Sequence, residues 1–544
     1  MRVCNSTHGA VRYARVMPAD SAFTLEVFRH LFASVAEEMG VTVQRSANSP
    51  NIKERRDYSC AVFDRGGRMV AQAAHVPVHL GSMPMSVRAA TDLYEKTSPS
   101  AGDVVILNDP YLGGTHLPDI TTVSPVFVSD PPVLWGWVAT RAHHADVGGM
   151  APGSMPMSTE LFHEGIVIPP LKLMDAGALD TQLIDLICRN VRTPLERRGD
   201  LEAQLASHRV GEARLQAFAR RYGNHVLRQM ARELLDYTER LVVTRLRRIP
   251  DGIYEYEDFL DDDGTGGEPT PIRVAITVKE GRMAVDFTGT GLAVAGSLNA
   301  PAAVTHSAVV YVARCLAGVD VPTNDGAMAA LDVYIPVGTV LNPLPPHAVA
   351  AGNVETSQRV VDVLWGALAT AMPDDVPAAS QGTMNNLVIG GKDPRNGDFY
   401  TYYETIAGGS GAGPKRPGAS AVHVGMTNTL NTPIEAQELA YPMRARRYAI
   451  RTGSGGDGAH RGGNGVVREI EMLAPATVTI VAERRRKSPW GLQGGGPGRR
   501  GRDYIKTNGR WRRISGKGTH ELKAGDSVRV STPGGGGWGS SDAA

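Results

Sequence analysis

The chain of 544 residues has few cysteines and no long apolar run. None of the cysteines forms a CxxC pair, which rules out a zinc ribbon built on cysteine and suits a reducing compartment. No window reaches the roughly 20 apolar residues of a membrane span, and the N-terminus lacks the apolar region of a secretion signal. The sequence therefore predicts a cytoplasmic protein that does not enter a membrane. The four cysteines are Cys4, Cys60, Cys188 and Cys315.

An excess of charge of one sign is also missing. The chain has 57 Lys and Arg against 56 Asp and Glu, a net charge of +1, so it has no global attraction to nucleic acid or anionic lipid. Only 6% of its residues are aromatic, which argues against an extended surface for stacking bases. We expect neither nucleic acid nor a membrane as a partner.

The familiar nucleotide and nucleophile motifs are absent from the sequence. It contains no G-x-x-x-x-G-K-[ST] loop and no G-x-S-x-G elbow. The glycine run at 494–498 lacks the preceding strand and following helix that a dinucleotide-binding loop needs. If ATP is used, we expect that this chain does not hold it alone.

The length and the apolar pattern predict an α+β protein of two to four domains, with mixed sheets, a helical insert and a β-rich C-terminal domain. Apolar residues recur at helical spacing over 195–248, with an interruption at Gly223, and alternate from Tyr254 to Phe287. Glycine-dense loops separate the strands beyond Tyr448. The predicted domains are an N-terminal α/β metal-site domain (1–194), a helical segment (195–250), a central α+β domain (251–445) and a glycine-rich β domain (446–544).

Within the first domain, the pattern predicts a helix that begins near Ser21 and ends at Gly40. A hairpin follows, with strands over 55–64 and 69–74 and a turn at Gly66. Short apolar runs at 104–107 and 133–140 predict buried strands. Each of these two strands leads into a polar cluster.

The first polar cluster, residues 108–119, is rich in turn residues and presents His116 and Asp119 three residues apart. Pro118 fixes one backbone dihedral between them, and the glycines before His116 permit a sharp turn. The second cluster, residues 141–149, begins where a strand ends in the pair His143 and His144. Imidazole and carboxylate donors at two strand ends outline a metal site.

We expect His116, Asp119 and His143 to bind a divalent metal, Zn, Mn or Fe, and to be the catalytic residues together with Asp57. Asp57 would be the fourth ligand or would orient the others. Neighbouring side chains on an extended segment point to opposite faces, so His143 and His144 are not expected to bind one ion. The full donor set is Asp57, His75, His79, His116, Asp119, His143, His144 and Asp146.

Three later runs are dense in polar side chains. Residues 353–358 precede an expected helix, where Thr356 or Ser357 could cap it and Glu355 would complement its dipole. Residues 381–386 and 402–405 are rich in neutral hydrogen-bonding groups. These would suit an amide or imide substrate, or simply buried turns.

At these residues the chain resembles the hydantoinase B and oxoprolinase family, which includes the B-type components of ATP-dependent N-methylhydantoinases and oxoprolinases and a related component of acetone carboxylases. The resemblance covers nearly the whole chain. The motifs that carry it lie, in order, at residues 54–60, 75–83, 108–119, 143–149, 352–358, 381–385, 428–435, 454–456 and 489–491.

This resemblance implies a hetero-oligomer with an A-type subunit of actin-like ATPase fold, which holds ATP and Mg²⁺ and phosphorylates the carbonyl oxygen of the substrate. It implies that His116, Asp119 and His143 are the metal positions, in agreement with the spacing. The expected reaction is ATP-dependent opening of a cyclic amide, such as a hydantoin or 5-oxoproline. The alternatives are ATP-dependent carboxylation of a small ketone, which the shorter chain makes less favoured, and a scaffold subunit that binds metal structurally.

Overall fold

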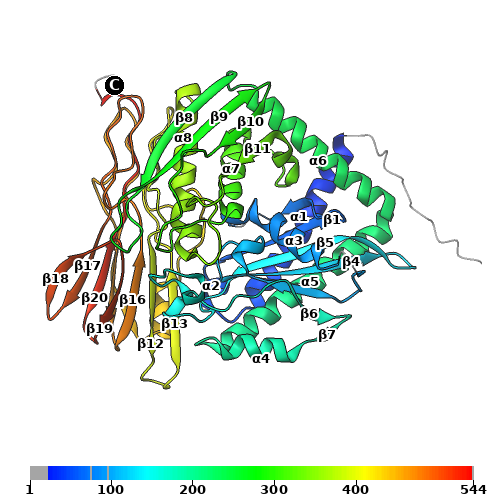
Figure 1. Cartoon of the computed structure of the whole chain (residues 1–544), viewed down its shortest axis with the longest axis horizontal. Coiled ribbons are helices and arrows are strands. Elements are labelled where there is room, and N and C mark those ends of the chain that lie inside the picture. The colour runs from blue at the N-terminus through cyan, green and yellow to red at the C-terminus, as the bar shows by residue number, and fades with distance from the viewer. Residues whose placement is uncertain (1–21, 74–75, 95–96, 542–544) are drawn as a thin grey trace, which may run out of the picture.

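A computed structural model describes residues 22–73, 76–94 and 97–541 of the chain (Figure 1). Within those ranges the strands form four sheets, and long helices pack beside them. This arrangement of helices and sheets in several packed units confirms the predicted α+β, multi-domain fold class. Among the described residues, no helix is both long enough and apolar enough to cross a bilayer.

The N-terminal sheet is antiparallel, with strand order β2-β1-β5-β4-β3-β6-β7. The predicted hairpin around Gly66 and the strand over 104–107 are confirmed, and the strand predicted over 133–140 extends to His143. Asp119, expected in a loop, is the first residue of a strand. The strands are β1 (Tyr58–Asp64), β2 (Met69–Gln72), β3 (Val104–Leu107), β4 (Asp119–Val128), β5 (Val133–His143), β6 (Leu171–Asp175) and β7 (Ala178–Leu179).

Both faces of this sheet are buried, because successive side chains of β1 enter different cores. Val62 packs with helices α1 (Ala22–Ser46) and α5 (Pro194–Tyr222), whereas Phe63 packs with α3 (Ser82–Asp92). Alternate residues of a strand point to opposite faces, so a sheet covered on both sides needs apolar residues at every position. The continuous run of buried residues at 58–63, apolar except for Ser59, follows from this arrangement.

Helix α1 does not end at Gly40, as the sequence predicted, but continues to Ser46. Val43, beyond the glycine, is fully buried in the same core as Phe32. This packing outweighs the cost of about 1 kcal/mol that a glycine imposes inside a helix. The predicted start near Ser21 lies outside the described residues.

The two helices predicted in series are confirmed as α5 and α6 (Asn224–Leu246), with Gly223 between them at φ +89°. The central sheet follows, with order β11-β10-β9-β8, and its strand β9 alternates buried and outward residues as predicted. Helices α7 and α8 pack in the same core as this sheet. These elements are β8 (Gly252–Leu260), β9 (Thr270–Lys279), β10 (Arg282–Asp286), α7 (Ala302–Ala317), β11 (Leu331–Tyr334) and α8 (Ser357–Ala371).

Two further sheets enclose a third core, with orders β13-β12-β16-β19 and β14-β15-β20-β17-β18. The expected domain boundary at residue 446 remains a prediction, and the first of these sheets has strands on both sides of it. The strands are β12 (Asn386–Lys392), β13 (Phe399–Glu404), β14 (Met443–Ile450), β15 (Val466–Met472), β16 (Ala476–Val481), β17 (Arg502–Thr507), β18 (Arg510–Ile514), β19 (Lys517–Leu522) and β20 (Ser527–Ser531). Short helices α2 (Pro50–Lys53), α4 (Thr181–Arg189) and α9 (Ile434–Ala440) complete the α-helices of the described ranges.

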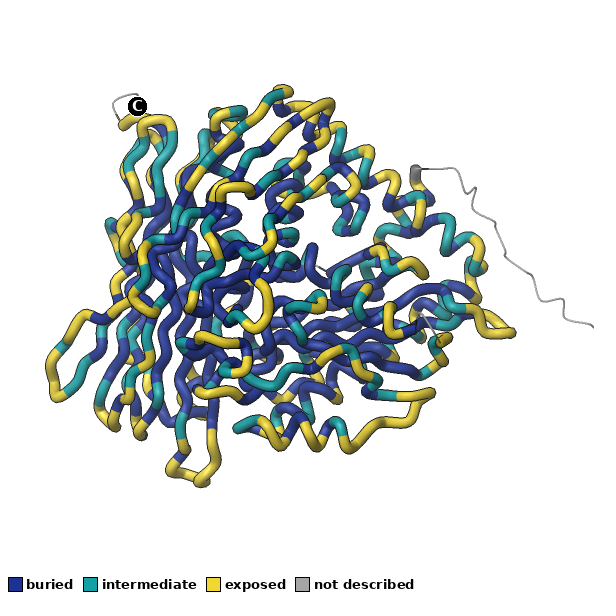
Figure 2. Tube along the Cα trace, viewed as in Figure 1, coloured by how far each residue is buried: buried dark blue, intermediate teal, exposed yellow. Residues whose placement is uncertain are grey.

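The glycine-dense loops predicted between the strands are confirmed, and these loops pack against one another in a layer beside the sheets. We call residues 409–411, 455–463, 491–498 and 534–537 the glycine layer. Its segments are joined laterally by backbone hydrogen bonds, such as Gly456 N to Gly535 O at 2.9 Å and Gly535 N to Gly463 O at 3.0 Å. Figure 2 shows that the interior of the molecule is buried while the hairpin ends are exposed; within the glycine layer, residues 534–537 are buried and residues 491–497 are half-buried or exposed.

Close approach of the backbones explains why the layer consists of glycine. A Cβ atom on Gly535 would lie 2.0 Å from the carbonyl oxygen of Ser410, and one on Gly463 would lie 1.9 Å from that of Ala419. These separations are far below van der Waals contact, so no larger side chain fits without displacing backbone.

Candidate metal centre

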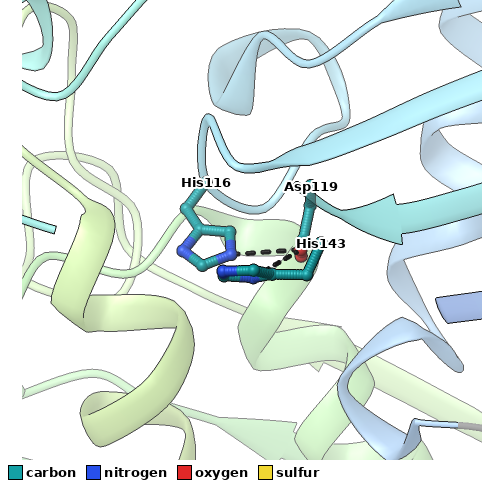
Figure 3. Close-up of side chains that lie close together, drawn as sticks. All are labelled: His116, Asp119 and His143. Carbon is teal, nitrogen blue, oxygen red and sulfur yellow. Dashed lines mark ion pairs between the residues drawn. The ribbon is translucent and has the colours of Figure 1, made fainter. Parts of the chain in front are cut away.

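Three of the predicted donors meet at the ends of two neighbouring strands. Asp119 begins β4 and His143 ends β5, and the antiparallel register sets these two residues directly opposite each other. His116, in the turn that leads into β4, places Nε2 at 3.1 Å from Asp119 Oδ1, and His143 Nδ1 lies 3.3 Å from the same oxygen (Figure 3). Their possible ligand atoms all lie within 4.8 Å of one another, and all three residues are buried.

The orientation of His116 is set by a distant segment. Its Nδ1 donates to the carbonyl oxygen of Ala350 at 3.2 Å, which leaves Nε2 directed at Asp119. The amides of Val349 and Ala350 in turn donate to Oε1 of buried Glu164, at 2.9 and 3.0 Å. Glu164 therefore fixes the backbone that orients the His116 ring.

The ring of His143 lies on Tyr403, with ring centroids 4.6 Å apart and an angle of 14° between the planes. The guanidinium of Arg55 lies 4.8 Å from the centroid of the Tyr403 ring and donates to the Tyr403 carbonyl at 2.6 Å. Asn51 accepts a second bond from Arg55 and donates to the His143 carbonyl at 2.7 Å. Both the backbone and the ring of His143 are therefore fixed from outside its own strand.

The second oxygen of Asp119 has its own donors. Oδ2 accepts a hydrogen bond from Thr115 Oγ1 at 2.6 Å and a long one from Asn353 Nδ2 at 3.5 Å. His79 Nε2 lies 3.4 Å from it, and His79 Nδ1 lies 2.8 Å from Ser59 Oγ. Asp119 is thus surrounded by polar groups that stabilise a carboxylate.

These contacts decide the charges at neutral pH. Burial opposes ionisation of Asp119, but His116 and the hydrogen bonds from the three histidines hold its pKa well below its usual range. Burial also opposes charge on His116, yet Asp119 raises the pKa of that imidazole. Burial lowers the pKa of His79, which is therefore neutral.

The arrangement fits a divalent metal ion. Nε2 of His143 is buried and makes no hydrogen bond, so it offers a lone pair that no protein donor uses, and Nε2 of His116 has no neighbour other than the carboxylate of Asp119 at 3.1 Å. Two imidazoles and one carboxylate form a mixed nitrogen and oxygen donor set, which suits Zn, Mn or Fe.

The remaining predicted donors divide into two groups. Asp57 lines the same cavity as His79, Asp119 and His143, although it is not among the three clustered ligand groups. His144 points elsewhere, with Nε2 at 3.0 Å from Gln204 Oε1, as the alternation along a strand predicts.

Asp146 has a structural role, because it accepts hydrogen bonds from Arg192 and from the amides of Gly148 and Gly153. His75 was also in the predicted donor set, but it lies outside the described residues. The donors brought together are therefore His79, His116, Asp119 and His143, with Asp57 on the same cavity wall.

A small cavity opens beside the cluster, with about 20 Å³ open to the centre of a water molecule. Its lining includes both polar and apolar side chains. This volume has room for about one water molecule or ion. The lining consists of Asp57, Val76, Val78, His79, Asp119, His143, Asn353, Val354, Met384, Tyr403, Thr405, Met426, Thr427 and Thr429.

The prediction that Thr356 or Ser357 caps a helix was wrong. Residues Gly352–Thr356 form a π-helical turn that continues directly into α8, and neither residue caps a helix end. The side chains of Thr356 and Ser357 instead donate to backbone carbonyls inside the fold, those of Leu298 and Asn353. Because the chain was already helical before Ser357, no free helix N-terminus existed there to cap.

The sequence did not single out Asn353 and Tyr403 as residues of the centre. The signal was nonetheless present, since residues 353–358, 381–386 and 402–405 were identified as dense in polar groups. In the structure, Asn353, Tyr403 and Thr405 line the cavity, while Gln381 and Asn385 are buried and hydrogen-bond to each other.

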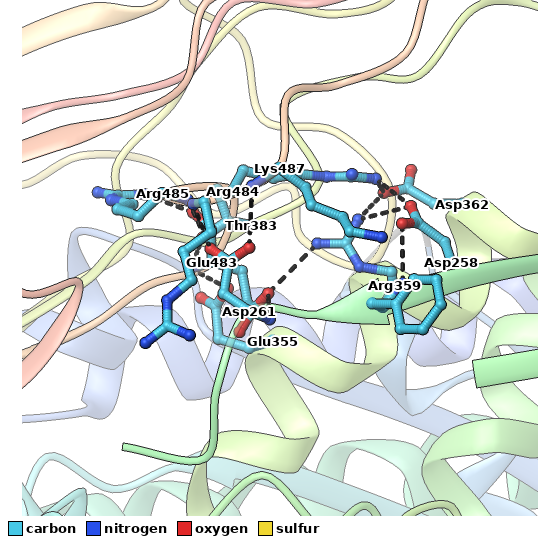
Figure 4. Close-up of polar contacts among 12 residues, drawn as sticks. Asp258, Asp261, Glu355, Arg359, Asp362, Thr383, Glu483, Arg484, Arg485 and Lys487 are labelled. Carbon is cyan, nitrogen blue, oxygen red and sulfur yellow. Dashed lines mark hydrogen bonds and ion pairs between the residues drawn. The ribbon is translucent and has the colours of Figure 1, made fainter. Parts of the chain in front are cut away.

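A buried ion-pair network lies behind the π-helical turn (Figure 4). Arg359 Nη1 lies 2.7 Å from Asp362 Oδ2, and Arg484 Nη2 lies 2.8 Å from Asp258 Oδ2. Because Arg359 also pairs with Glu483 at 3.4 Å, the network joins α8 to β8 and to the segment after β16. It makes one rigid unit of the elements that support the turn.

Known proteins resemble the chain along its whole described length. It is 40% identical to 5-oxoprolinase 1 of Arabidopsis thaliana over 95% of its own length, but spans only 42% of that relative. It is 30% identical to the putative B component of a D-/L-hydantoinase of Pseudomonas sp. (strain NS671), over 95% of this chain and 89% of that one.

Two solved structures share the fold. The ATP-dependent caprolactamase from Pseudomonas jessenii matches with a TM-score of 0.88 and 28% identity, over 96% of this chain and 91% of that chain. The nucleotide-free structure of an acetone carboxylase matches with a TM-score of 0.87 over 96% of this chain and 76% of that chain, and at 19% identity this is a likeness of fold alone. The sequence pattern described as hydantoinase B/oxoprolinase matches residues 21–541. These matches confirm the predicted resemblance: the chain belongs to the hydantoinase B/oxoprolinase family.

Proposed function

We propose that this chain is the B-type subunit of an ATP-dependent hydrolase that opens a cyclic amide, of the hydantoin or 5-oxoproline type. The observation that carries the proposal is the convergence of buried His116, Asp119 and His143 within 4.8 Å in a member of this family. The ATP-dependent caprolactamase among its structural neighbours acts, by its name, on a cyclic amide.

The proposal assigns ATP and Mg²⁺ to an A-type partner subunit with an actin-like ATPase fold. Two observations support a partner. The Pseudomonas relative is described as one component, of B type, of a larger enzyme, and this chain spans only 42% of the Arabidopsis 5-oxoprolinase. In the proposed hetero-oligomer, the partner phosphorylates the carbonyl oxygen of the ring, which removes the resonance that protects an amide.

His116, Asp119 and His143 would hold the metal, with Asp57 on the cavity wall as a fourth ligand or as the residue that orients the others. A metal bound there polarises a carbonyl or activates water. Water adds to the activated carbon, the ring C–N bond breaks, the nitrogen gains a proton and phosphate leaves. Burial of the centre excludes bulk water, which strengthens the electrostatic interactions of Asp119 and of the two imidazoles.

The test is to purify the chain with an A-type partner and to assay ATP-dependent hydrolysis of 5-oxoproline and of hydantoin. Hydrolysis without bicarbonate supports the proposal, whereas strict consumption of bicarbonate would identify a carboxylase. Loss of turnover in His116→Ala, with folding and assembly intact, would exclude a scaffold role. His30→Ala is the matched control, because the His30 side chain is 72% exposed.

A further inference from the structure

The π-helical turn Gly352–Thr356 brings Asn353 to the candidate metal centre. A π turn inside a helix is uncommon and is frequently found at functional sites, because it rotates one residue out of the regular helical face. Here the turn directs Asn353 into the cavity that His79, Asp119 and His143 line.

Contacts on every side fix this turn. The carboxyl group of Glu355 accepts the Met384 amide at 3.0 Å, the Asn386 side chain at 2.7 Å and the Glu483 amide at 3.1 Å. At Gly352, a Cβ atom would lie 1.9 Å from the carbonyl oxygen of Asn299. The turn is therefore determined by its surroundings and presents Asn353 in one position.

The two ends of the Asn353 amide face different partners. The NH₂ end of Asn353 faces Asp119, because Nδ2 donates to Asp119 Oδ2 at 3.5 Å. The carbonyl oxygen Oδ1 then faces away from Asp119. It is buried and has no hydrogen-bond partner. A buried carbonyl oxygen of this kind is unfavourable unless a ligand donates to it.

We propose that Asn353 Oδ1 accepts the N–H of the substrate's ring amide and thereby selects cyclic amides whose reacting nitrogen carries a hydrogen. The inference rests on the proposed function. Asn353 Oδ1 is the one fully buried side-chain oxygen in the described lining of the cavity that lacks a hydrogen-bond partner, and the N–H is a donor that every lactam or imide unsubstituted at nitrogen has. Asn353 is thus a substrate-positioning and specificity-determining residue.

The rest of the lining suits the remainder of such a ring. Val354, Met384 and Met426 form an apolar wall for its carbon atoms. The cavity as it stands has about 20 Å³ open to the centre of a water molecule, so a ring enters only when lining side chains change rotamer. The unbranched, flexible side chains of Met384 and Met426 can make that change at low cost.

The experiment compares Asn353→Ala with wild type in the assembled complex with the partner subunit. The substrates are 5-oxoproline or hydantoin, whichever wild type opens, and the same ring methylated at the nitrogen of the bond that breaks. We expect the ratio of kcat/KM for the N–H ring to that for the N-methyl ring to fall at least about tenfold, because the N–H loses its acceptor. The metal content of the purified complex should be unchanged.

Each other outcome has a definite meaning. An unchanged substrate ratio overturns the inference. Loss of bound metal in Asn353→Ala, measured by elemental analysis, would show that Asn353 acts on the metal centre, either as a ligand or through Asp119, and would also overturn it. Failure of wild type to open either ring would reject the proposed function itself, independently of any variant.

Two further variants keep the test interpretable. Asn353→Ser retains a hydroxyl acceptor and replaces the alanine variant if that one misfolds; it should keep part of the substrate ratio. Val354→Ala changes the neighbouring residue of the same turn and the same cavity but removes no acceptor. It should alter both substrates alike.

Discussion

The imidazole of His143 and the phenol of Tyr403 lie almost parallel, 4.6 Å apart, although they are 260 positions apart in the chain. The Tyr403 hydroxyl donates to Asn386 Oδ1 at 2.9 Å, which fixes the plane of the phenol ring. Through this stack, the position of β12 and β13 determines where the ring of His143, a candidate ligand at the end of β5, lies. It makes the centre depend on how two sheets pack together.

We expect Tyr403→Leu to weaken binding of Mn²⁺ or Zn²⁺ about tenfold, because residues that orient a ligand typically contribute that much. Tyr403→Phe keeps the aromatic face and should bind metal as wild type does. It should lower the unfolding free energy by about 1–3 kcal/mol, because Asn386 loses its donor. Calorimetric titration of the metal-free protein measures the first effect and denaturant titration the second. Equal metal affinity in the leucine variant would refute the role given to the stack.

Added metal should stabilise the protein only when Asp119 is intact. A ligand that binds the folded state alone raises its stability by about 2.7 kcal/mol at 100 times its Kd. We therefore expect Mn²⁺ or Zn²⁺ to raise the Tm of wild type and not that of Asp119→Asn, and a chelator to reverse the rise. Asp325→Asn is the control, since Asp325 is a half-buried acidic side chain that accepts the Met69 amide. A metal-dependent rise in Tm in Asp119→Asn would place the binding site elsewhere.

Buried His208 should make stability depend on pH. Burial lowers its pKa from 6.5 to about 3, so it stays neutral in the folded state while the unfolded chain takes up a proton below pH 6.5. Stability from this residue is therefore complete above pH 6.5 and declines as the pH falls towards 3. At pH 5 the loss amounts to about 2 kcal/mol.

The variant His208→Gln isolates that contribution. It should be less stable than wild type at pH 7, because His208 bonds to Thr122 and Ser124, but the gap should shrink by about 2 kcal/mol at pH 5. Urea titrations at the two pH values provide the comparison. The exposed substitution His30→Gln should leave the pH dependence of wild type in place. If the stability difference between wild type and His208→Gln is the same at pH 7 and at pH 5, His208 does not contribute to the pH dependence of stability.

The glycine layer predicts a large contrast between two alanine substitutions. In Gly535→Ala the new methyl group would meet the Ser410 carbonyl at 2.0 Å, so we expect a loss of more than about 4 kcal/mol or failure to fold. Gly413 has no atom within 4 Å of the corresponding position, and Gly413→Ala should change stability by less than about 0.5 kcal/mol. Denaturant titration and soluble yield measure both. Similar stability in the two variants would contradict the close packing described here.

Local sequence patterns predicted helices and strands well where the spacing of apolar residues agrees with their burial in the structure. The break at Gly223, the hairpin at Gly66 and the strand over 104–107 all follow from residue spacing within about ten positions. The prediction that the first helix ends at Gly40 was wrong, because packing against α5 stabilises the helix beyond that residue. This packing is a contact with residues about 170 positions later in the chain. Local propensity cannot report such a contact.

In the same way, part of the candidate centre could be predicted from local sequence patterns and part could not. Residues 108–119 and 141–149 identified His116, Asp119 and His143, since their donors lie at strand ends with defined spacing. The roles of Ala350, Asn353 and Tyr403 depend on how separate cores pack together. The spacing of apolar residues in the sequence does not report that packing. The π-helical turn was similarly hidden, because its sequence also satisfies the rules for capping a helix.

The ligands of the centre all lie before residue 150, but the groups that aim them, Ala350 and Tyr403, lie in the second half of the chain. During synthesis on a ribosome, the candidate ligands therefore emerge long before the surfaces that set their geometry. If the centre binds a metal as proposed, the ion would be acquired at the end of maturation, and an N-terminal fragment would carry every candidate ligand without forming the centre.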